Sequence, residues 1–216
     1  MKIIVIGATG LVGKWILLKL LDSPSVKEII LFSRREVDVV HEKIKNHIID
    51  FDKISEWESL IQGDVLFSAL GTTLKTAGSK SAQFRVDFDY QYNVAQVAKK
   101  NGVKKLVLIS SVNADPDSSF FYLSMKGKLE QELSFLDFKS LVILRPGPLV
   151  GLRSVPRLGE IISHLFLKLI PDFLLTYGMK PISGEKVALV AIDSLKSNDV
   201  GIRIIGPKEI HLHHHN

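Results

Sequence analysis

Four side chains in the middle of the chain have the types and spacing needed to transfer a proton. Tyr122 and Lys126 lie four residues apart in a segment whose pattern predicts a helix, so both side chains project from one face. Ser110 and Ser111 end the apolar segment before that helix. Reduction of a carbonyl needs a proton donor, and a nearby ammonium favours loss of a phenol proton. Because a serine hydroxyl can hold the substrate oxygen, the four residues together favour acid–base chemistry at a carbonyl.

A glycine-rich segment near the start of the chain predicts a dinucleotide site. Residues 3–6 are all apolar and predict a buried strand, and glycines follow at three-residue intervals before a helix that begins at Lys14. Such a turn lets the backbone approach a pyrophosphate and points a helix N-terminus at its negative charge. A purely steric use of glycine in a tight turn is the alternative. The expected cofactor contacts in this turn are Gly7, Thr9, Gly10, Leu11, Val12 and Gly13.

The residues after the second predicted strand indicate which dinucleotide is bound. NAD sites usually carry a carboxylate at this position, whereas this chain has Ser33, Arg34 and Arg35. A guanidinium can hold a 2′-phosphate through two hydrogen bonds, so we expect NADP(H), with Arg34 as the better candidate and NAD(H) as the alternative. The arginines could instead face solvent. After the third strand, Asp50 is placed to accept a hydrogen bond from the adenine amino group, and Phe51 to flank the adenine.

Apolar strands and helical patterns alternate along the chain and predict an α/β fold. The predicted architecture is a Rossmann-like, doubly wound parallel sheet with a small C-terminal region on the substrate side. Ligands bind at the carboxyl ends of such strands, where the candidate residues fall. We expect one domain over residues 1–216, in which residues 146–200 contribute the substrate-side lid. Strands are predicted at 3–6, 28–32, 46–49, 64–70, 105–109, 140–144 and 201–206, and helices at 14–21, 81–100, 121–136, 161–170 and 184–195.

Composition excludes several classes of protein. The chain has 216 residues, no cysteine and a formal charge of +5, so a disulfide framework and a thiol nucleophile are excluded. We expect no nucleic-acid partner because no basic run is interleaved with aromatic residues. No secretory signal or integral membrane segment is evident, so we expect a cytoplasmic location. No metal site is expected, and the histidine-rich residues 211–216 are interpreted as a frayed terminus or an added tag.

Five motifs in their order along the chain resemble the short-chain dehydrogenase/reductase superfamily. More narrowly, the chain resembles its atypical, NmrA-like branch, which contains the Tat-interacting-protein type of small oxidoreductase. The motifs are GATGLVG at 7–13, FSALGTT at 67–73, LISS at 108–111, YxxxKG at 122–127 and LRPGP at 144–148.

This resemblance implies a Rossmann-like reductase that uses NAD(P)(H). Tyr122 would be the general acid/base and Lys126 its partner, which also bonds the nicotinamide ribose. Ser111 would be the catalytic serine, with Ser110 as the alternative. The turn after the fourth strand departs from the Asn-Asn-Ala-Gly-like element of the main family, so the resemblance does not extend to a particular substrate. Further cofactor contacts are expected from Ala69, Leu70, Gly71, Thr72, Pro146, Gly147 and Pro148.

Three functions are compatible with these residues. The first is an NADP(H)-dependent oxidoreductase that reduces a small carbonyl substrate, as a monomer or homodimer. The second is an NADP(H)-binding redox sensor or regulatory protein with little or no turnover. The third, a sugar-nucleotide epimerase or dehydratase, is disfavoured by the short C-terminal portion.

Other residues near the predicted site have weaker roles. Phe120 and Phe121 are expected to pack the helix rather than line a substrate pocket. Arg145 is expected to orient the loop after the sixth strand. His164 is not expected to be a catalytic base, because no carboxylate partner is placed directly beside it.

Overall fold

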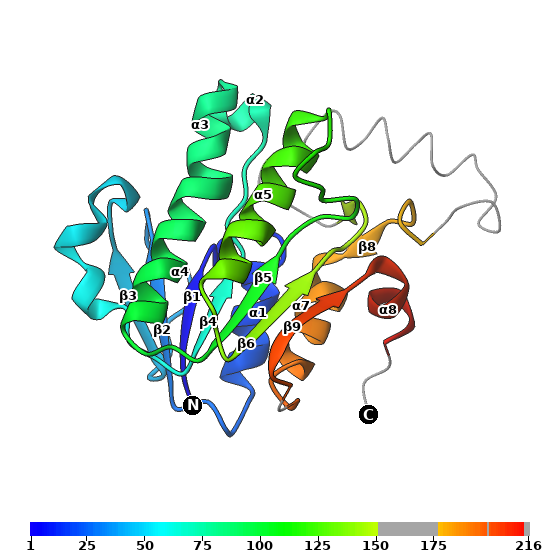
Figure 1. The fold of residues 1–216 in the computed structure, drawn as a ribbon. Coiled ribbons are helices and arrows are strands. Elements are labelled where there is room, and N and C mark those ends of the chain that lie inside the picture. Colours follow the sequence, from blue (N-terminus) through cyan, green and yellow to red (C-terminus); the bar gives the residue numbers. More distant parts are fainter. Residues whose placement is uncertain (151–176, 198, 214–216) are drawn as a thin grey trace.

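The computed structural model describes residues 1–150, 177–197 and 199–213. In this part of the chain, seven strands form one parallel sheet with the order β3-β2-β1-β4-β5-β6-β9 (Figure 1). The order reverses between β1 and β4, which is the switch point where sheets of this type bind ligands. The predicted Rossmann-like, doubly wound α/β architecture is therefore confirmed. The strands are β1 (Lys2–Ile6), β2 (Glu28–Ser33), β3 (Ile44–Ile48), β4 (Val65–Ser68), β5 (Lys105–Ile109), β6 (Ser140–Leu144) and β9 (Gly201–Ile205).

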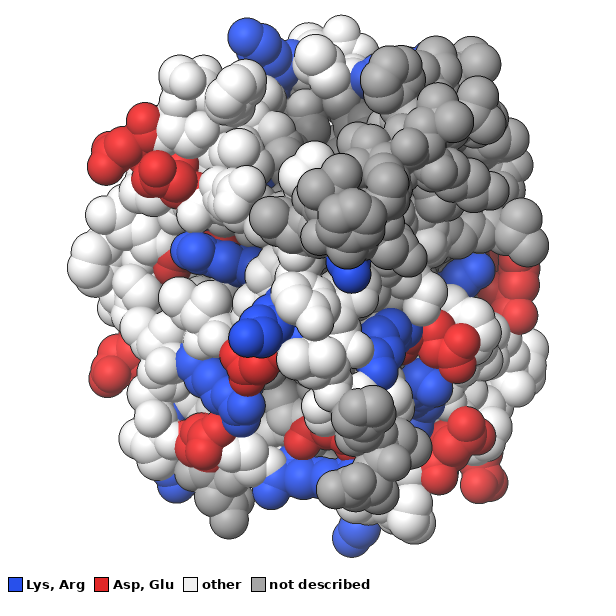
Figure 2. All heavy atoms as spheres, turned by 90° about the vertical axis from the view of Figure 1, so that its right-hand side faces the viewer, with Lys and Arg blue, Asp and Glu red and all other residues white. Residues whose placement is uncertain are grey.

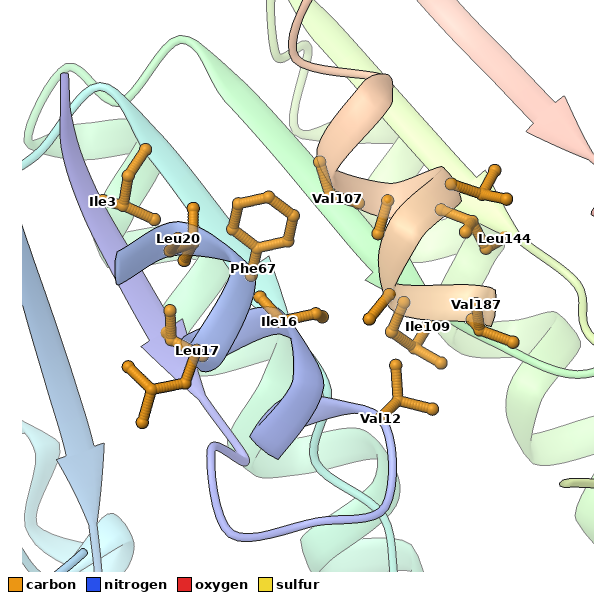
Figure 3. Close-up of a cluster of buried hydrophobic side chains, with 14 of the residues drawn as sticks. Ile3, Val12, Ile16, Leu17, Leu20, Phe67, Val107, Ile109, Leu144 and Val187 are labelled. Carbon is orange, nitrogen blue, oxygen red and sulfur yellow. The ribbon is translucent and has the colours of Figure 1, made fainter. Parts of the chain in front are cut away.

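Helices cover both faces of the sheet. On one face lie α1 (Gly13–Leu21) and α7 (Gly184–Asp193), and on the other lie α4 (Tyr90–Lys100) and α5 (Phe121–Phe135) (Figure 1). Figure 3 shows side chains of α1 and α7 packed over β4, β5 and β6. Alternate residues of β1 enter the two cores, which explains why residues 3–6 are uniformly apolar.

The predicted long helix at 81–100 is built from three segments. The chain passes from α3 (Lys80–Phe84) through a π-helical segment, Arg85–Asp89, into α4. The rings of Phe84, Phe88 and Tyr92 stack in sequence along these segments, with centroids 4.7 and 6.1 Å apart. The sequence pattern did not reveal the π-helical segment, which shifts the register of the residues around it.

Short elements connect the strands and add to the predicted set. The third and fourth strands differ from their predicted bounds by a few residues, because strand ends carry little sequence signal. Two 3₁₀ segments, Phe51–Glu56 and Glu58–Leu60, follow β3, and α2 (Leu74–Ala77) precedes α3. A separate two-stranded parallel sheet joins β7 (Leu149–Val150) to β8 (Ile182–Ser183).

The C-terminal segment is more ordered than its sequence suggested. A helix, α8 (Pro207–Leu212), follows β9 and buries Ile210 in the core with α7. His213 Nε2 lies 2.8 Å from Asp193 Oδ2, so the expectation of a frayed end is wrong for residues 211–213. The predicted helix at 161–170, with His164, and the last three residues lie outside the described residues.

Charge on the face that carries β9 and α8 is mixed. Figure 2 shows lysine and arginine side chains interspersed there with aspartate and glutamate. Arg203 of β9, for example, pairs with Asp199 at 3.0 Å and with Glu209 at 3.3 Å. Across the described ranges, no helix is both long and apolar enough to span a bilayer.

Candidate functional site

The glycine turn after β1 packs directly on the turn after β4. Gly7 has a φ of +85°, and a Cβ at this position would lie 2.4 Å from the carbonyl of Ala69. A Cβ on Gly13 would lie only 2.0 Å from the carbonyl oxygen of Gly7. Only glycine fits these two positions, so the turn is held tightly at the switch point of the sheet. Within it Thr9 is exposed, while Leu11 and Val12 are buried.

The start of α1 leaves backbone N–H groups without side-chain partners. Its N-cap residue, Val12, has no side-chain capping bond, and the first turn of α1 contains no acidic residue. The N-terminus of α7 also reaches this turn, because a Cβ on Gly184 would lie 2.3 Å from the Leu11 carbonyl oxygen. Because no acidic side chain lies in this first turn, the positive end of the helix dipole favours an anion here.

A surface hollow of about 470 Å³ opens between the end of β2 and the segment after β4. Arg34 lines it, is exposed, and has no ion-pair partner among the described residues. Arg35 is also exposed but does not line the hollow. Ser33 is buried, and its hydroxyl bonds Asn46 Oδ1 at 3.0 Å and the carbonyl of Arg35. The hollow is lined by Arg34, Thr72, Thr76, Ala77, Ser81, Ala82, Arg85, Val86 and Tyr90.

The predicted adenine contacts after β3 have structural roles in this state. Asp50 Oδ1 accepts the N–H of Asp52 at 3.0 Å and so caps the following 3₁₀ segment. The Phe51 ring is 5% exposed and packs against Trp57 and Tyr90, so most of it belongs to the core rather than to an open surface. Tyr90 itself lines the hollow, which the sequence pattern did not indicate.

Tyr122 and Lys126 occupy the first two turns of α5, as predicted, but in different environments. Tyr122 is 39% exposed, whereas Lys126 is 2% exposed. A Cβ on Gly127 would lie 2.2 Å from the backbone at Asp115 and Pro116, so this helix lies directly against the loop that follows β5. Close packing at Gly127 therefore fixes where the tyrosine and lysine stand.

Lys126 forms a buried ion pair that the sequence did not reveal. Its Nζ lies 3.2 Å from Oδ1 of Asp87, which is in the π-helical segment and only 1% exposed. Burial lowers the pKa of Lys126, but the charges of Asp87, Tyr122 and Glu130 and a hydrogen bond to Asp87 raise it by more. The net pKa is above its ordinary value, so Lys126 is an ammonium at neutral pH.

The two serines after β5 are not equivalent. Ser110 is buried and its hydroxyl donates to Glu130, a buried side chain of α5. Glu130 also accepts from Arg145 Nε, at 3.1 Å to each carboxylate oxygen. Ser111 is partly exposed, and within the part of the chain that the structure describes its hydroxyl makes one contact, at 3.3 Å to the Val112 carbonyl. Its hydroxyl is therefore the better placed of the two to bind a ligand. Arg145 thus ties the end of β6 to α5.

The segment after β6 lies beside the end of β5. The Pro146 carbonyl accepts the Val112 N–H at 2.9 Å, and the Pro148 carbonyl accepts the Ile182 N–H at 2.9 Å. A Cβ on Gly147 would come within 2.9 Å of the Lys180 carbonyl oxygen. The predicted contacts at 146–148 therefore adjoin Ser111, as their positions at neighbouring strand ends indicated.

The two phenylalanines before Tyr122 differ from expectation. Phe120 is 71% exposed, so the expected packing role is wrong for this residue. Phe121 is partly buried, with the ammonium of Lys80 5.5 Å from its ring centroid. Phe120 is the N-cap residue of α5, where its backbone is extended.

Comparison with known proteins identifies the family. The sequence profile of HIM1 matches residues 24–168, which is more than half of the chain. The chain belongs to the HIM1 family. It is 37% identical over 199 residues to Protein FMP52, mitochondrial, of Candida albicans, covering 89% of this chain and 87% of that protein. It is 37% identical over 175 residues to rat Protein HTATIP2, covering 79% of this chain and 72% of that protein.

Solved structures with this fold include sugar-nucleotide enzymes. MoeE5 in complex with UDP-glucose and NAD has a TM-score of 0.74 and 13% identity, covering 95% of this chain and 75% of that one. The UDP-glucose 4-epimerase of Thermotoga maritima has a TM-score of 0.71 and 15% identity, covering 95% of this chain and 76% of that one. At these identities the likeness concerns the fold. The family match therefore places the chain with FMP52- and HTATIP2-like proteins, and the structures show that it shares its fold with NAD-bound enzymes such as MoeE5.

The relatives overturn one expectation. The fungal FMP52 proteins carry the word mitochondrial in their names, so the expected cytoplasmic location is wrong on this comparison. The error arose because the absence of a secretory signal was taken to leave the cytoplasm as the default location.

Proposed function

We propose that this HIM1 family member is an NADP(H)-dependent oxidoreductase that reduces a small carbonyl substrate. One observation carries the proposal: a buried, charged Lys126 lies one helical turn from a partly exposed Tyr122 at the carboxyl edge of a Rossmann-like sheet. An ammonium held beside a phenol favours departure of the phenol proton when a substrate oxygen needs it.

The residues at the switch point fit a dinucleotide. The tight turn at Gly7–Gly13 leads into the N-terminus of α1, which has no side-chain cap and no acidic residue in its first turn and so suits a pyrophosphate. Arg34, unpaired among the described residues and facing the hollow, suits a 2′-phosphate and supports NADP(H) over NAD(H). Thr72 and Tyr90 would line the adenosine end of the same hollow.

The proposed chemistry divides between cofactor and protein. When bound, NADPH supplies the hydride that adds to the carbonyl carbon. Tyr122 donates its phenol proton to the carbonyl oxygen, and its exposure lets solvent restore that proton. Ser111 holds the same oxygen through its hydroxyl, and Lys126 stabilises the phenolate left on Tyr122.

A second candidate is cofactor binding with little turnover, as in a redox sensor. The Asp87–Lys126 pair favours this sensor role. Its carboxylate partly offsets the ammonium charge, so Lys126 assists loss of the Tyr122 proton less than an unpaired ammonium would. A panel of aldehydes and ketones, followed by NADPH absorbance, separates the two. Turnover of any member that disappears in Tyr122→Phe supports the reductase, whereas tight NADPH binding without turnover across the panel supports the sensor.

We also propose a mitochondrial location, from the names of the fungal relatives. Fractionation of cells that express the untagged protein tests this. Recovery with a mitochondrial matrix or membrane marker is expected, and recovery with cytosolic markers alone contradicts it.

A further inference from the structure

The carboxylate of Asp87 joins two parts of the site. Its Oδ1 receives the Lys126 ammonium of α5 at 3.2 Å. Its Oδ2 accepts the backbone N–H of Thr72 at 2.8 Å, in the turn that follows β4. Thr72 lines the hollow that holds Arg34. One buried side chain therefore contacts both the lysine beside the proposed proton donor and the proposed cofactor turn.

The backbone around Asp87 is fixed independently of its side chain. Gln91 Nε2 donates to the Asp87 carbonyl at 2.6 Å, and Gln91 Oε1 accepts the Ser68 hydroxyl at 2.7 Å. Ser68 ends β4, so these bonds connect the π-helical segment to the sheet. π-Helical turns are uncommon and frequently occur at functional sites. This one carries Asp87 into the space between α5 and the turn after β4.

Asp87 is the charged group in direct contact with Lys126. The titratable groups that face the lysine are Asp87 from the π-helical segment and Tyr122 and Glu130 from α5. Glu130 is already engaged by Arg145, and Tyr122 is uncharged while it carries its proton. Without Asp87, burial would favour the neutral amine of Lys126.

We propose that Asp87 is a positioning residue whose single carboxylate keeps Lys126 charged beside Tyr122 and ties it to the cofactor turn at Thr72. This role rests on the proposed function, because it assigns a purpose to the contact within that site. The two roles of the carboxylate can be separated. An asparagine at 87 keeps an oxygen for the Thr72 N–H but loses the charge, and an alanine loses both.

The first test uses the protein without cofactor. Thermal unfolding of wild type, Asp87→Asn and a matched control, Asp89→Asn, is followed from pH 6 to pH 11. Asp89 lies in the same π-helical segment, and burial raises its pKa. Asp89→Asn therefore removes the free-energy cost of a partly buried carboxylate, whereas Asp87→Asn removes the partner of Lys126. At pH 7 we expect Asp87→Asn to lower the Tm by roughly 6–20 °C, whereas Asp89→Asn leaves it unchanged or slightly raised.

The pH dependence of the Tm difference shows whether Asp87 acts through the charge on Lys126. In the wild type the raised pKa of Lys126 gives stability that is present below the ordinary lysine pKa and is lost as pH rises through the folded value. In Asp87→Asn the pKa of Lys126 should fall below its ordinary value, so protonation disfavours the folded state at neutral pH. The difference in Tm is therefore largest near pH 7, narrows as pH rises towards the ordinary lysine pKa, and narrows further as pH passes through the raised wild-type pKa.

A double variant guards against simple misfolding. Asp87→Asn combined with Lys126→Met replaces the pair by neutral groups of similar length and should recover most of the lost Tm. It should not recover carbonyl turnover. Affinity for NADPH, measured by calorimetry, should change less than about 3-fold in Asp87→Asn and fall further in Asp87→Ala, which frees the Thr72 N–H.

The outcomes distinguish this role from the proposed function. A constant Tm difference across the pH range, or a double variant no more stable than Asp87→Asn, overturns the role of Asp87. Equal NADPH affinity in the asparagine and alanine variants overturns the link to Thr72. If the wild type binds no pyridine nucleotide, the proposed function fails, while the unfolding data still decide whether Asp87 holds the charge on Lys126.

Discussion

The ammonium of Lys126 and the carboxylate of Asp87 lie 3.2 Å apart, and each residue is at least 98% shielded from solvent. The two residues are 39 positions apart in the sequence and come from different helical segments, so the pair exists only in the folded chain. It joins the helix of the proposed proton donor to the turn at the switch point. Much of the expected behaviour of the protein depends on this contact.

Removal of the lysine alone should be costly. Lys126→Met leaves the Asp87 carboxylate buried without its cation, and we expect the free energy of unfolding to fall by about 3–5 kcal/mol. Lys128→Met on the exposed face of the same helix is the control, with an expected change within about 0.5 kcal/mol. Urea unfolding of both variants measures the difference, and equal midpoints would show that the pair adds no net stability.

Cofactor preference should depend on Arg34 and not on its neighbour. Arg34→Ala removes the guanidinium that lines the hollow, so affinity for NADPH should fall roughly 10- to 100-fold, with little change for NADH. Arg35 is also exposed but lies outside the hollow, so Arg35→Ala should leave both affinities unchanged. Calorimetric titration of each variant with each nucleotide checks this. Equal losses for NADPH and NADH in Arg34→Ala would contradict the 2′-phosphate assignment.

The two serines should separate stability from turnover. Ser110→Ala removes a donor to buried Glu130 and should cost about 1–3 kcal/mol of stability. Ser111→Ala removes a weak 3.3 Å contact to the Val112 carbonyl and should leave stability unchanged while lowering kcat. Unfolding and steady-state rates measured on the same preparations test the contrast. If turnover depends on Ser110 and not on Ser111, the assignment of the catalytic serine is reversed.

The glycine turn should tolerate no side chain. Gly7→Ala places a Cβ against the Ala69 backbone at positive φ, and we expect it to cost about 2–5 kcal/mol and abolish nucleotide binding. Gly78→Ala is the matched control, because it has the same φ of +85° with no atom near the added Cβ. It should cost only about 1–2 kcal/mol and keep nucleotide affinity. Similar effects of the two substitutions would show that close packing at Gly7 is unimportant.

The sequence predicted the parts of the fold that depend on local pattern. Uniformly apolar strands, the glycine turn and the Tyr122–Lys126 spacing are visible because each is set by neighbours in the chain. Arg34 was proposed from its place after β2, and the structure places it at the hollow beside the segment after β4. Its contact with a cofactor phosphate stays a prediction. The face of Phe51 could not be predicted, because its partners Trp57 and Tyr90 belong to segments that meet only after folding.

The parts that sequence did not reveal are those created by tertiary contact. One extra residue in a helical turn has no compositional signature, so the segment Arg85–Asp89 reads as ordinary helix. Asp87 and Glu130 resemble surface acids in a helix until the positions of Lys126 and Arg145 are known. The prediction of a cytoplasmic location was wrong for a different reason, because location depends on cellular targeting rather than on the folded site.

The central claim is that Tyr122 supplies the proton for carbonyl reduction, and one comparison tests it most directly. Carbonyl-dependent oxidation of NADPH is measured for the wild type and for Tyr122→Phe, with Tyr92→Phe as the control for loss of a phenol hydroxyl elsewhere. Tyr122→Phe should lose turnover by roughly 10²- to 10⁴-fold, keep its NADPH affinity and stay within about 0.5 kcal/mol of wild-type stability. Unchanged turnover in Tyr122→Phe would contradict the account.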